Sequence, residues 1–253
     1  MRFNLKHFVI FITIVSLTGC KQGSGGLDRI SGKEIGITDS ISGIDSYDTY
    51  ITPYRQHIDS VLDDPLAYSK KTLSKNDGKY NTAIGNLLAD IVYEQSDPVF
   101  FKRTGNHIDV VLINFGGIRS IISKGAVSRR TAFEVMPFEN TVLILELTGV
   151  QMKQMADYLR KNKPHPFRGM KIVIDKDHNV KSFLINGEPV ADEKTYFVAT
   201  SNYLAYGGDG MYFLTNPVSS MEIDYLIRNE MIDYFTKVDT IDPVTDDRFI
   251  QLP

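Results

Sequence analysis

The chain has 253 residues, 42% of them hydrophobic, with 28 basic against 31 acidic side chains and a formal net charge of −3. This length can bury one large core or two small ones, and the composition excludes disordered and collagen-like chains. The mild negative charge argues against nucleic acid as a partner, since general nucleic-acid binding needs a basic surface. The single cysteine cannot form an intramolecular disulfide, so no disulfide framework is expected.

The first twenty residues have the pattern of a secretory signal peptide. Arg2 and Lys6 form a short positive region, and an apolar run over residues 8–15 follows. This run is too short for an ordinary transmembrane helix. Residues 17–20, LTGC, resemble a bacterial lipobox, in which the cysteine is lipidated and becomes the first residue of the mature protein. The alternative is a plain secretory signal in which Cys20 occurs by chance.

Lipidation of Cys20 would attach the protein to a membrane surface. Each buried methylene contributes about 0.8 kcal/mol, and stable anchoring needs more than one acyl chain. Removal of residues 1–19, the predicted signal peptide, leaves 234 residues and changes the net charge from −3 to −5. Residues 20–46 are rich in glycine and are expected to form the lipidated cysteine and a flexible tether. We therefore expect a lipid-anchored protein of the bacterial cell envelope that faces the periplasm or the cell surface.

Hydrophobic periodicity predicts helices and strands in mixed order after the tether. In chain order, we expect a helix from Asp48 to Leu62, a strand over 66–73, a helix from Asn81 or Thr82 through Val92, and a strand over 108–113. A loop after Arg119 with a helical turn at 132–135, a strand over 141–147 and a helix over 150–160 follow. We further expect strands over 170–174 and 180–185 and a hairpin-type turn at Asn186-Gly187. A strand over 195–201, a glycine-rich loop and a helix over 220–236 follow.

The mixture lacks a regular βαβ rhythm and shows no internal repeat. It predicts an α+β fold: a single domain of mixed β-sheets with flanking helices over residues 47–253.

Four short segments place turn glycines beside polar or aromatic side chains, and one of them, Phe167-Arg168-Gly169, is interpreted as an ordinary loop. The other three carry the prediction of a site. The first is Asn114-Phe115-Gly116-Gly117-Ile118-Arg119, directly after a predicted buried strand. Its two glycines let a ligand approach the backbone, and the arginine can hold an anion with its planar guanidinium. Taken alone, the segment also fits an ordinary turn from a strand into a loop.

The other two segments are Pro137-Phe138-Glu139-Asn140 and the run from Asn202 to Gly210, NYLAYGGDG. Phe138 fits the wall of a planar ligand site or an ordinary core position. Asp209 lies among glycines, and an ionised carboxylate accepts hydrogen bonds such as those from the paired hydroxyls of a ribose; the alternative is a solvated turn. Together the segments suggest a nucleotide pocket, in which stacking on an aromatic ring contributes about 1–3 kcal/mol per base.

The order Asn-x-Gly-Gly-Ile-Arg, Pro-Phe-x-Asn and Asn-aromatic-Leu-Ala-x-Gly-Gly-Asp-Gly resembles the C-terminal domain of the 5′-nucleotidases. The resemblance covers roughly Asp48 to Thr236 and rests on three motifs in order. In that family this domain recognises the nucleotide, while a separate N-terminal metallophosphatase domain holds two metal ions and performs the hydrolysis. The resemblance implies a 5′-nucleotidase C-terminal-like fold and a nucleoside or nucleoside 5′-monophosphate as ligand.

The resemblance also implies residue roles at the matching positions. Phe138 and Tyr203 would stack on the two faces of the base, Asp209 would bind the ribose hydroxyls, Asn114 would contact the base and Arg119 would bind phosphate. Asn140 is expected among the substrate-binding residues, and the backbone near Gly117, with that of Gly169 as a further candidate, would line the same pocket.

Two positions depart from the family pattern. Family members usually have another arginine just before the helix that is expected here from Asn81, where this chain has Gly78. Lys75 or Lys79 is a possible substitute, but a lysine lacks the bidentate guanidinium. Tyr203 stands where phenylalanine is usual and keeps the aromatic face. Base and sugar recognition is therefore expected to be preserved, and phosphate recognition to be weakened.

Hydrolysis by a two-metal centre needs a cluster of Asp, His and Asn ligands. The family supplies them from Asp-x-His and Gly-Asn-His-Asp/Glu motifs, and the sequence contains no Asp-x-His. Gly105-Asn106-His107 resembles part of the second motif, but Ile108 replaces the acid, so His107 is interpreted as an ordinary loop residue. We expect no catalytic residue, metal ligand or cofactor on this chain, and the divalent metal on a catalytic partner.

The leading hypothesis is the nucleotide-recognising half of a 5′-nucleotidase-type phosphohydrolase of nucleotide catabolism. Its partners would be the nucleotide, a separate metallophosphatase chain and, through the lipid anchor, the membrane. The alternative is a non-enzymatic nucleoside-binding lipoprotein. A degenerate domain that only holds partners together is a third possibility.

Overall fold

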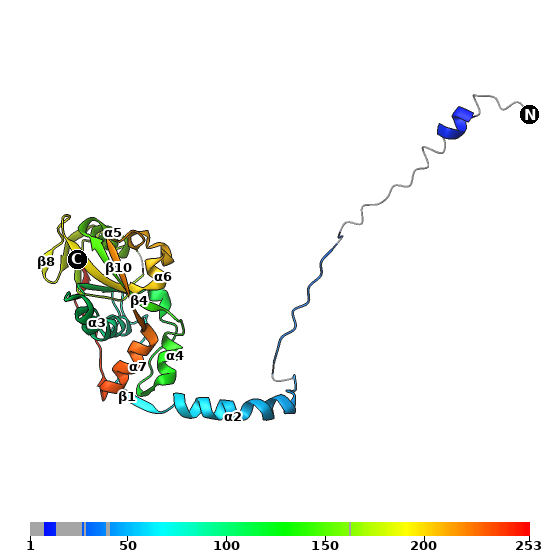
Figure 1. The fold of residues 1–253 in the computed structure, drawn as a ribbon, viewed down its shortest axis with the longest axis horizontal. Coiled ribbons are helices and arrows are strands. Elements are labelled where there is room, and N and C mark those ends of the chain that lie inside the picture. Colours follow the sequence, from blue (N-terminus) through cyan, green and yellow to red (C-terminus); the bar gives the residue numbers. More distant parts are fainter. Residues whose placement is uncertain (1–7, 14–26, 28, 39–40, 162) are drawn as a thin grey trace, which may run out of the picture. The chain divides into compact units, whose positions relative to one another are not determined.

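A computed structural model describes residues 8–13, 27, 29–38, 41–161 and 163–253. The chain divides into two compact units, Met1–Tyr50 and Ile51–Pro253. In the first unit, residues 8–13 are helical and residues 29–38 carry no helix or strand (Figure 1). The predicted lipidation site, Cys20, lies outside the described residues. Within the described ranges, no helix has the length and apolar character needed to cross a membrane.

The helix predicted from Asp48 is α2 (Asp45–Leu62), and none of its residues is buried. Its apolar positions, such as Ile58 and Val61, are exposed by 52% and 47%. The guanidinium of Arg130 contacts the end of α2, with Nη2 2.6 Å from Asp59 Oδ1 and Nε 2.5 Å from Asp63 Oδ1. Ion pairs with Arg130 therefore connect the end of this helix to α4, whereas the apolar side chains of the helix are not buried in the core.

The strands of the described residues form three sheets. The central sheet has the order β10 (Ser219–Leu226), β4 (Thr141–Thr148), β9 (Thr195–Ser201), β2 (Val110–Leu112) and β5 (Phe167–Arg168), and only its β2–β9 pair is parallel. A second sheet has the order β12 (Phe249–Gln251), β6 (Met170–Ile174), β7 (Val180–Ile185) and β8 (Glu188–Pro189). The third has the order β11 (Thr240–Ile241), β1 (Pro65–Ser69) and β3 (Gly125–Ser128).

The helices lie between and beside these sheets (Figure 1). Those packed against the sheets are α3 (Ala83–Thr104), α5 (Gly149–Leu159), α7 (Ile227–Lys237) and the shorter α4 (Arg129–Val135) and α6 (Asn202–Ala205). Three 3₁₀ turns complete the set: η1 (Phe115–Gly117), η2 (Gly208–Gly210) and η3 (Tyr212–Leu214). The mixture of sheets and helices confirms the predicted α+β class.

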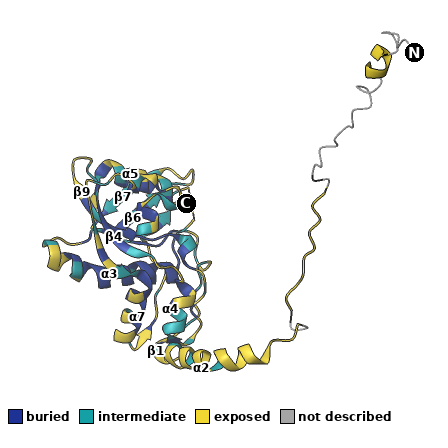
Figure 2. Cartoon of the chain, turned by 45° about the vertical axis from the view of Figure 1, so that its right-hand side comes forward, coloured by how far each residue is buried: buried dark blue, intermediate teal, exposed yellow. Residues whose placement is uncertain are grey.

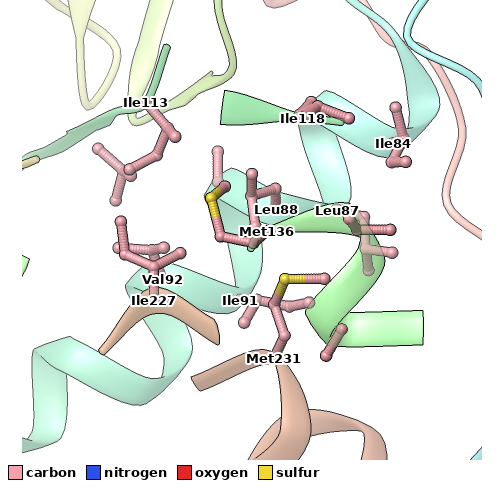
Figure 3. Close-up of a cluster of buried hydrophobic side chains, with 14 of the residues drawn as sticks. Ile84, Leu87, Leu88, Ile91, Val92, Ile113, Ile118, Met136, Ile227 and Met231 are labelled. Atoms are coloured by element: carbon pink, nitrogen blue, oxygen red, sulfur yellow. The ribbon is translucent and has the colours of Figure 1, made fainter. Parts of the chain in front are cut away.

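The central sheet separates two hydrophobic cores (Figure 2). Successive side chains of a strand point to opposite faces. Val142 and Ile144 of β4 accordingly pack in the core formed with α3 and α7, whereas Leu143 and Leu145 pack in the core formed with α5 and β6. Figure 3 shows the first of these cores, in which Val92 of α3 lies close to Ile227 of α7. Burial on both faces makes the central sheet a rigid base for the loops at its ends.

Helix α3 begins where the sequence predicted. The Thr82 side chain accepts a hydrogen bond from the Gly85 backbone N–H at 3.1 Å, which satisfies one of the free donors at the helix start. Gly105 ends the helix in the left-handed conformation, with φ of 77°. The cap confirms Thr82, of the two candidate residues, as the start of this helix.

The helix predicted over residues 220–236 is wrong in its first half. Residues up to Leu226 form β10, which pairs with β4, and the helix α7 begins only at Ile227. The spacing of Ile223, Ile227, Met231 and Phe235 indicated a helix, and all four side chains are indeed buried in one core. The pairing of β10 with β4 is irregular between Glu222 and Leu226, just before α7 begins. Ile223 in the strand and the three apolar residues of the helix therefore still point into the same core. The loop predicted after Arg119 likewise contains an additional short strand, β3.

Three loops meet at one edge of the central sheet. Strands β2 and β9 are parallel, with Leu112 opposite Thr200, so their carboxyl ends reach the same edge. Strand β4 is antiparallel to β9, with Val142 opposite Ser201, so its amino end reaches that edge too. The segments after β2, before β4 and after β9 are the three that the sequence singled out. The topology therefore brings residues 114–119, 137–140 and 202–210 together.

Candidate functional site

A pocket of about 290 Å³ lies where the three loops meet. Its lining residues come from all three segments: Asn114, Gly116, Arg119, Phe138, Asn140, Tyr203 and Asp209. The structure thus brings together six of the seven residues predicted to bind substrate. The seventh, Gly117, is buried beside the pocket, where a Cβ atom would come within 3.0 Å of the Asn114 side-chain oxygen. Gly116, the other glycine of the pair through which a ligand was expected to approach the backbone, lines the pocket itself.

The first loop is held by a buried histidine. The Phe115 backbone N–H donates to Nδ1 of His165 at 3.1 Å, and His165 is only 6% exposed. Burial lowers the pKa of His165 to about 4, so its imidazole is neutral near pH 7. Because Nδ1 accepts this bond, the ring proton resides on Nε2. His165 therefore fixes the backbone between Asn114 and the glycines, and sequence reasoning missed it because the contact spans fifty residues.

The second loop carries Phe138, whose ring is 41% exposed at the pocket. A buried arginine supports this loop from behind: Nη2 of Arg228 lies 2.5 Å from Glu139 Oε1, and Nη1 donates to the Phe138 carbonyl at 3.4 Å. The Asn140 carbonyl also accepts a hydrogen bond from the backbone N–H of Ile227 at 3.0 Å. The start of α7 therefore positions the aromatic wall, a role that no sequence pattern indicated.

The third loop brings Tyr203 and Asp209 into contact. The Tyr203 hydroxyl donates to Oδ1 of Asp209 at 2.8 Å, and the Asp209 backbone N–H donates back to the hydroxyl oxygen at 3.2 Å. The bond to the Asp209 carboxylate raises the pKa of the Tyr203 hydroxyl above its ordinary value. The Asp209 carbonyl accepts a further hydrogen bond from the Tyr158 hydroxyl at 2.8 Å. Tyr203 thus holds the carboxylate at the pocket, and Tyr158 of α5 holds the backbone carbonyl of the same residue.

Positive charge gathers at the first loop. The guanidinium of Arg119 lies 5.8 Å from the centre of the Phe138 ring and contacts the Gly116 carbonyl. Lys75 donates from Nζ to the carbonyl of Ile118, the neighbour of Arg119, at 2.9 Å. Lys79 instead donates to Gln251 Oε1 at 2.9 Å and lines another pocket. Of the two candidate substitutes for the missing arginine, Lys75 is therefore the one beside Arg119.

Two further residues named from the sequence lie away from this pocket. Gly169 lines a separate pocket with Arg168 and Arg248. His107 follows α3, where Nδ1 lies 2.8 Å from Asp97 Oδ2 and the ring stacks on Phe101. Within the described ranges, no group of three or more His, Cys, Asp or Glu side chains is placed to hold a metal ion.

The arrangement suits a flat, partly polar ligand that carries hydroxyls. The pocket is lined by the aromatic rings of Phe138 and Tyr203, the side-chain amides of Asn114 and Asn140, the Asp209 carboxylate and the Arg119 guanidinium. Base stacking uses the aromatic faces, and a carboxylate only accepts hydrogen bonds.

Residues 62–216 match the model of the 5′-nucleotidase C-terminal domain family. The chain therefore belongs to that family.

Individual relatives agree with this assignment. Protein UshA of Escherichia coli is 33% identical over 147 residues, which are 55% of this chain and 26% of that protein. A snake venom 5′-nucleotidase of Crotalus adamanteus is 25% identical over 189 residues, which cover 66% of this chain and 32% of the venom protein. The chain thus spans about a quarter to a third of the length of these relatives.

Solved structures show the same fold. The chain resembles a 5′-nucleotidase precursor of Thermus thermophilus with a TM-score of 0.69 and 21% identity, covering 82% of this chain and 43% of that one. It also resembles a 5′-nucleotidase of Staphylococcus aureus described as putative, with a TM-score of 0.64 and 20% identity, over 85% of this chain and 45% of that one. The C-terminal domain fold predicted from the three motifs is confirmed.

Proposed function

We propose that this chain recognises nucleosides and nucleoside 5′-monophosphates through the pocket at the edge of the central sheet. The observation that supports the proposal most strongly is the convergence of Phe138, Tyr203, Asp209 and Arg119 on one pocket. Phe138 and Tyr203 would stack on the base, Asp209 would accept bonds from the ribose hydroxyls, and Arg119 would bind phosphate. Asn114 and Asn140 would contact the base from the pocket wall.

Hydrolysis would depend on divalent metal ions, for which the described residues hold no cluster of ligands. We propose that they are held by a metallophosphatase partner on a separate chain, which would cover the pocket so that Arg119 and the metals share the phosphate. The family resemblance supports a separation of nucleotide recognition and hydrolysis between two domains. If the purified chain alone hydrolysed AMP in a zinc-dependent reaction, with activity proportional to its concentration, the proposed division between two chains would be wrong.

We propose, from the pattern of the first twenty residues, that the chain acts at a membrane of the cell envelope. If the LTGC sequence is processed as a lipobox, Cys20 carries the acyl chains and the domain is held at a membrane of the cell envelope. Metabolic labelling of expressing bacteria with a radioactive fatty acid tests this proposal, with Cys20→Ser as the control. Label on the wild-type chain that is lost in the variant supports it, and an unlabelled wild type contradicts it.

One observation favours the second candidate, a non-enzymatic nucleoside-binding lipoprotein. Gly78 occupies the position of a family arginine, and Lys79 is engaged with Gln251, so the phosphate has fewer donors. Calorimetric titration with adenosine and AMP separates the two candidates. Tighter binding of AMP supports the nucleotide-recognising half of an enzyme, and equal affinities support the binding lipoprotein.

Lys75 gives this comparison a matched pair of variants. If Lys75 assists Arg119, Lys75→Ala should weaken the binding of AMP and leave adenosine binding unchanged. Lys79→Ala removes the same charge four residues away and should leave both ligands unaffected. Equal behaviour of the two variants would exclude Lys75 from the phosphate site.

A further inference from the structure

The hydroxyl of Tyr203 makes contacts in the site that stacking of its aromatic ring on a base does not require. Stacking on a base requires only the face of the ring, and the family usually has phenylalanine at this position. In this structure the hydroxyl makes two hydrogen bonds with one residue. It donates to Oδ1 of Asp209 at 2.8 Å and accepts from the Asp209 backbone N–H at 3.2 Å. Side chain and backbone of the aspartate are therefore held by the same oxygen.

The loop is shaped to allow this contact. Asp209 has a positive φ of 53°, a conformation that aspartate adopts more readily than most residues. At Gly208 a Cβ atom would come within 2.5 Å of both the Tyr203 ring and the Tyr203 carbonyl oxygen, so the tyrosine lies directly against a glycine. The Tyr158 hydroxyl holds the Asp209 carbonyl from the other side at 2.8 Å. The aspartate is thus held at three points: its side-chain Oδ1, its backbone N–H and its carbonyl oxygen.

An exposed carboxylate without such bonds samples several side-chain rotamers and loses that freedom when it binds a ligand. Asp209 is exposed to solvent, and its carboxylate lines the pocket. The bond from Tyr203 occupies one position at Oδ1 and leaves Oδ2 and the remaining acceptor positions for a ligand. A group oriented before binding gives tighter binding, because less entropy is lost when the complex forms.

From this geometry we propose that the Tyr203 hydroxyl is a positioning group. It holds the Asp209 carboxylate in the orientation that accepts the 2′- and 3′-hydroxyls of a ribose, and so makes the pocket selective for ribonucleosides over nucleosides that lack these hydroxyls. The inference rests on the proposed nucleoside binding and adds a specificity-determining residue to it. It separates the two parts of one side chain, since the ring contacts the base and the hydroxyl acts through Asp209.

Calorimetric titration of the purified chain with adenosine and with 2′,3′-dideoxyadenosine tests this proposal. Tyr203→Phe keeps the ring and removes only the hydroxyl. We expect the variant to bind adenosine roughly 3- to 10-fold more weakly, as for the loss of one hydrogen bond, and to bind dideoxyadenosine as the wild type does. The matched control is Tyr206→Phe, which removes a hydroxyl from a side chain that is 79% exposed and does not line the pocket, and which should change neither affinity.

Each other outcome has a definite meaning. If Tyr203→Phe binds adenosine as tightly as the wild type or more tightly, the positioning role is wrong and nucleoside binding stands. If the variant loses the same factor for both ligands, the hydroxyl supports the shape of the pocket and not the ribose contact, which also contradicts the proposal. If the wild type binds neither nucleoside, the proposed function fails and the inference fails with it.

Discussion

Glu230 offers a test of the packing between α3 and α7, because it buries a carboxyl group in an apolar interface. The residue is 0% exposed, its Oε1 contacts the Ser96 hydroxyl, and its Oε2 has no hydrogen-bond partner among the described residues. Burial, together with the nearby charge of Asp233, raises the pKa of this carboxyl well above its ordinary value of 4.5. The folded protein therefore keeps Glu230 protonated at pH values where the unfolded chain ionises it.

The raised pKa predicts a loss of stability as pH increases. Below pH 4.5 both states carry the proton and no free energy is lost. Above it, each pH unit lowers the free energy of unfolding by about 1.4 kcal/mol, until the folded pKa is reached. At pH 7 the effect is therefore at most about 3.4 kcal/mol. Glu230→Gln has no proton to lose, so the stability of the variant relative to the wild type should rise between pH 4.5 and pH 7.

The absolute difference at one pH is less informative than this trend. The glutamine amide introduces a buried donor where Oε2 lies unpaired, which costs about 1–3 kcal/mol at every pH. Urea unfolding of both proteins, followed by far-UV circular dichroism because the chain has no tryptophan, gives the difference as a function of pH. A difference that is the same at pH 4.5 and pH 7 would refute the buried, protonated state of Glu230.

Three further variants test how the pocket is built. Phe138→Ala removes one aromatic wall and should weaken adenosine binding by about 1–3 kcal/mol, measured by calorimetry, and an unchanged affinity would remove Phe138 from the base site. Arg228→Ala removes the bonds that hold Glu139 and the Phe138 carbonyl, and should weaken adenosine binding several-fold even though Arg228 does not line the pocket. Binding equal to wild type would show that the loop keeps its place without Arg228. Gly208→Ala places a methyl group within 2.5 Å of the Tyr203 ring and should weaken adenosine binding while far-UV circular dichroism stays unchanged; retained affinity would show that the loop can move at no cost to the site.

Local patterns predicted much of the fold. Strands β6, β7 and β9 begin and end where the alternation of apolar residues placed them, and Thr82 caps α3 as its position before an apolar stripe indicated. Such features depend on residues that are neighbours in the chain. The strand β10 was missed because it is defined by its pairing with β4, which no local pattern records.

In the site, too, residues in short local motifs were predicted from the sequence, whereas residues that support them from distant parts of the chain were not. Six predicted residues share one pocket because they lie in three short motifs at the ends of neighbouring strands. Arg228 and His165 support those motifs from positions about 90 and 50 residues away in the chain. A buried arginine in a helix or a histidine between prolines carries no sequence mark of such a role. The contact between Tyr203 and Asp209 spans only six residues, but it depends on a left-handed aspartate that composition does not reveal.

The central claim is that the pocket at the sheet edge binds a nucleoside between Phe138 and Tyr203. Calorimetric titration of the purified wild-type chain with adenosine, repeated with Asp209→Ala, tests it most directly. We expect one binding site per chain for the wild type and a loss of binding in the variant, since Asp209 is the proposed acceptor for the ribose hydroxyls. A wild-type chain that binds no adenosine, or a variant that binds it with unchanged affinity, would contradict the account.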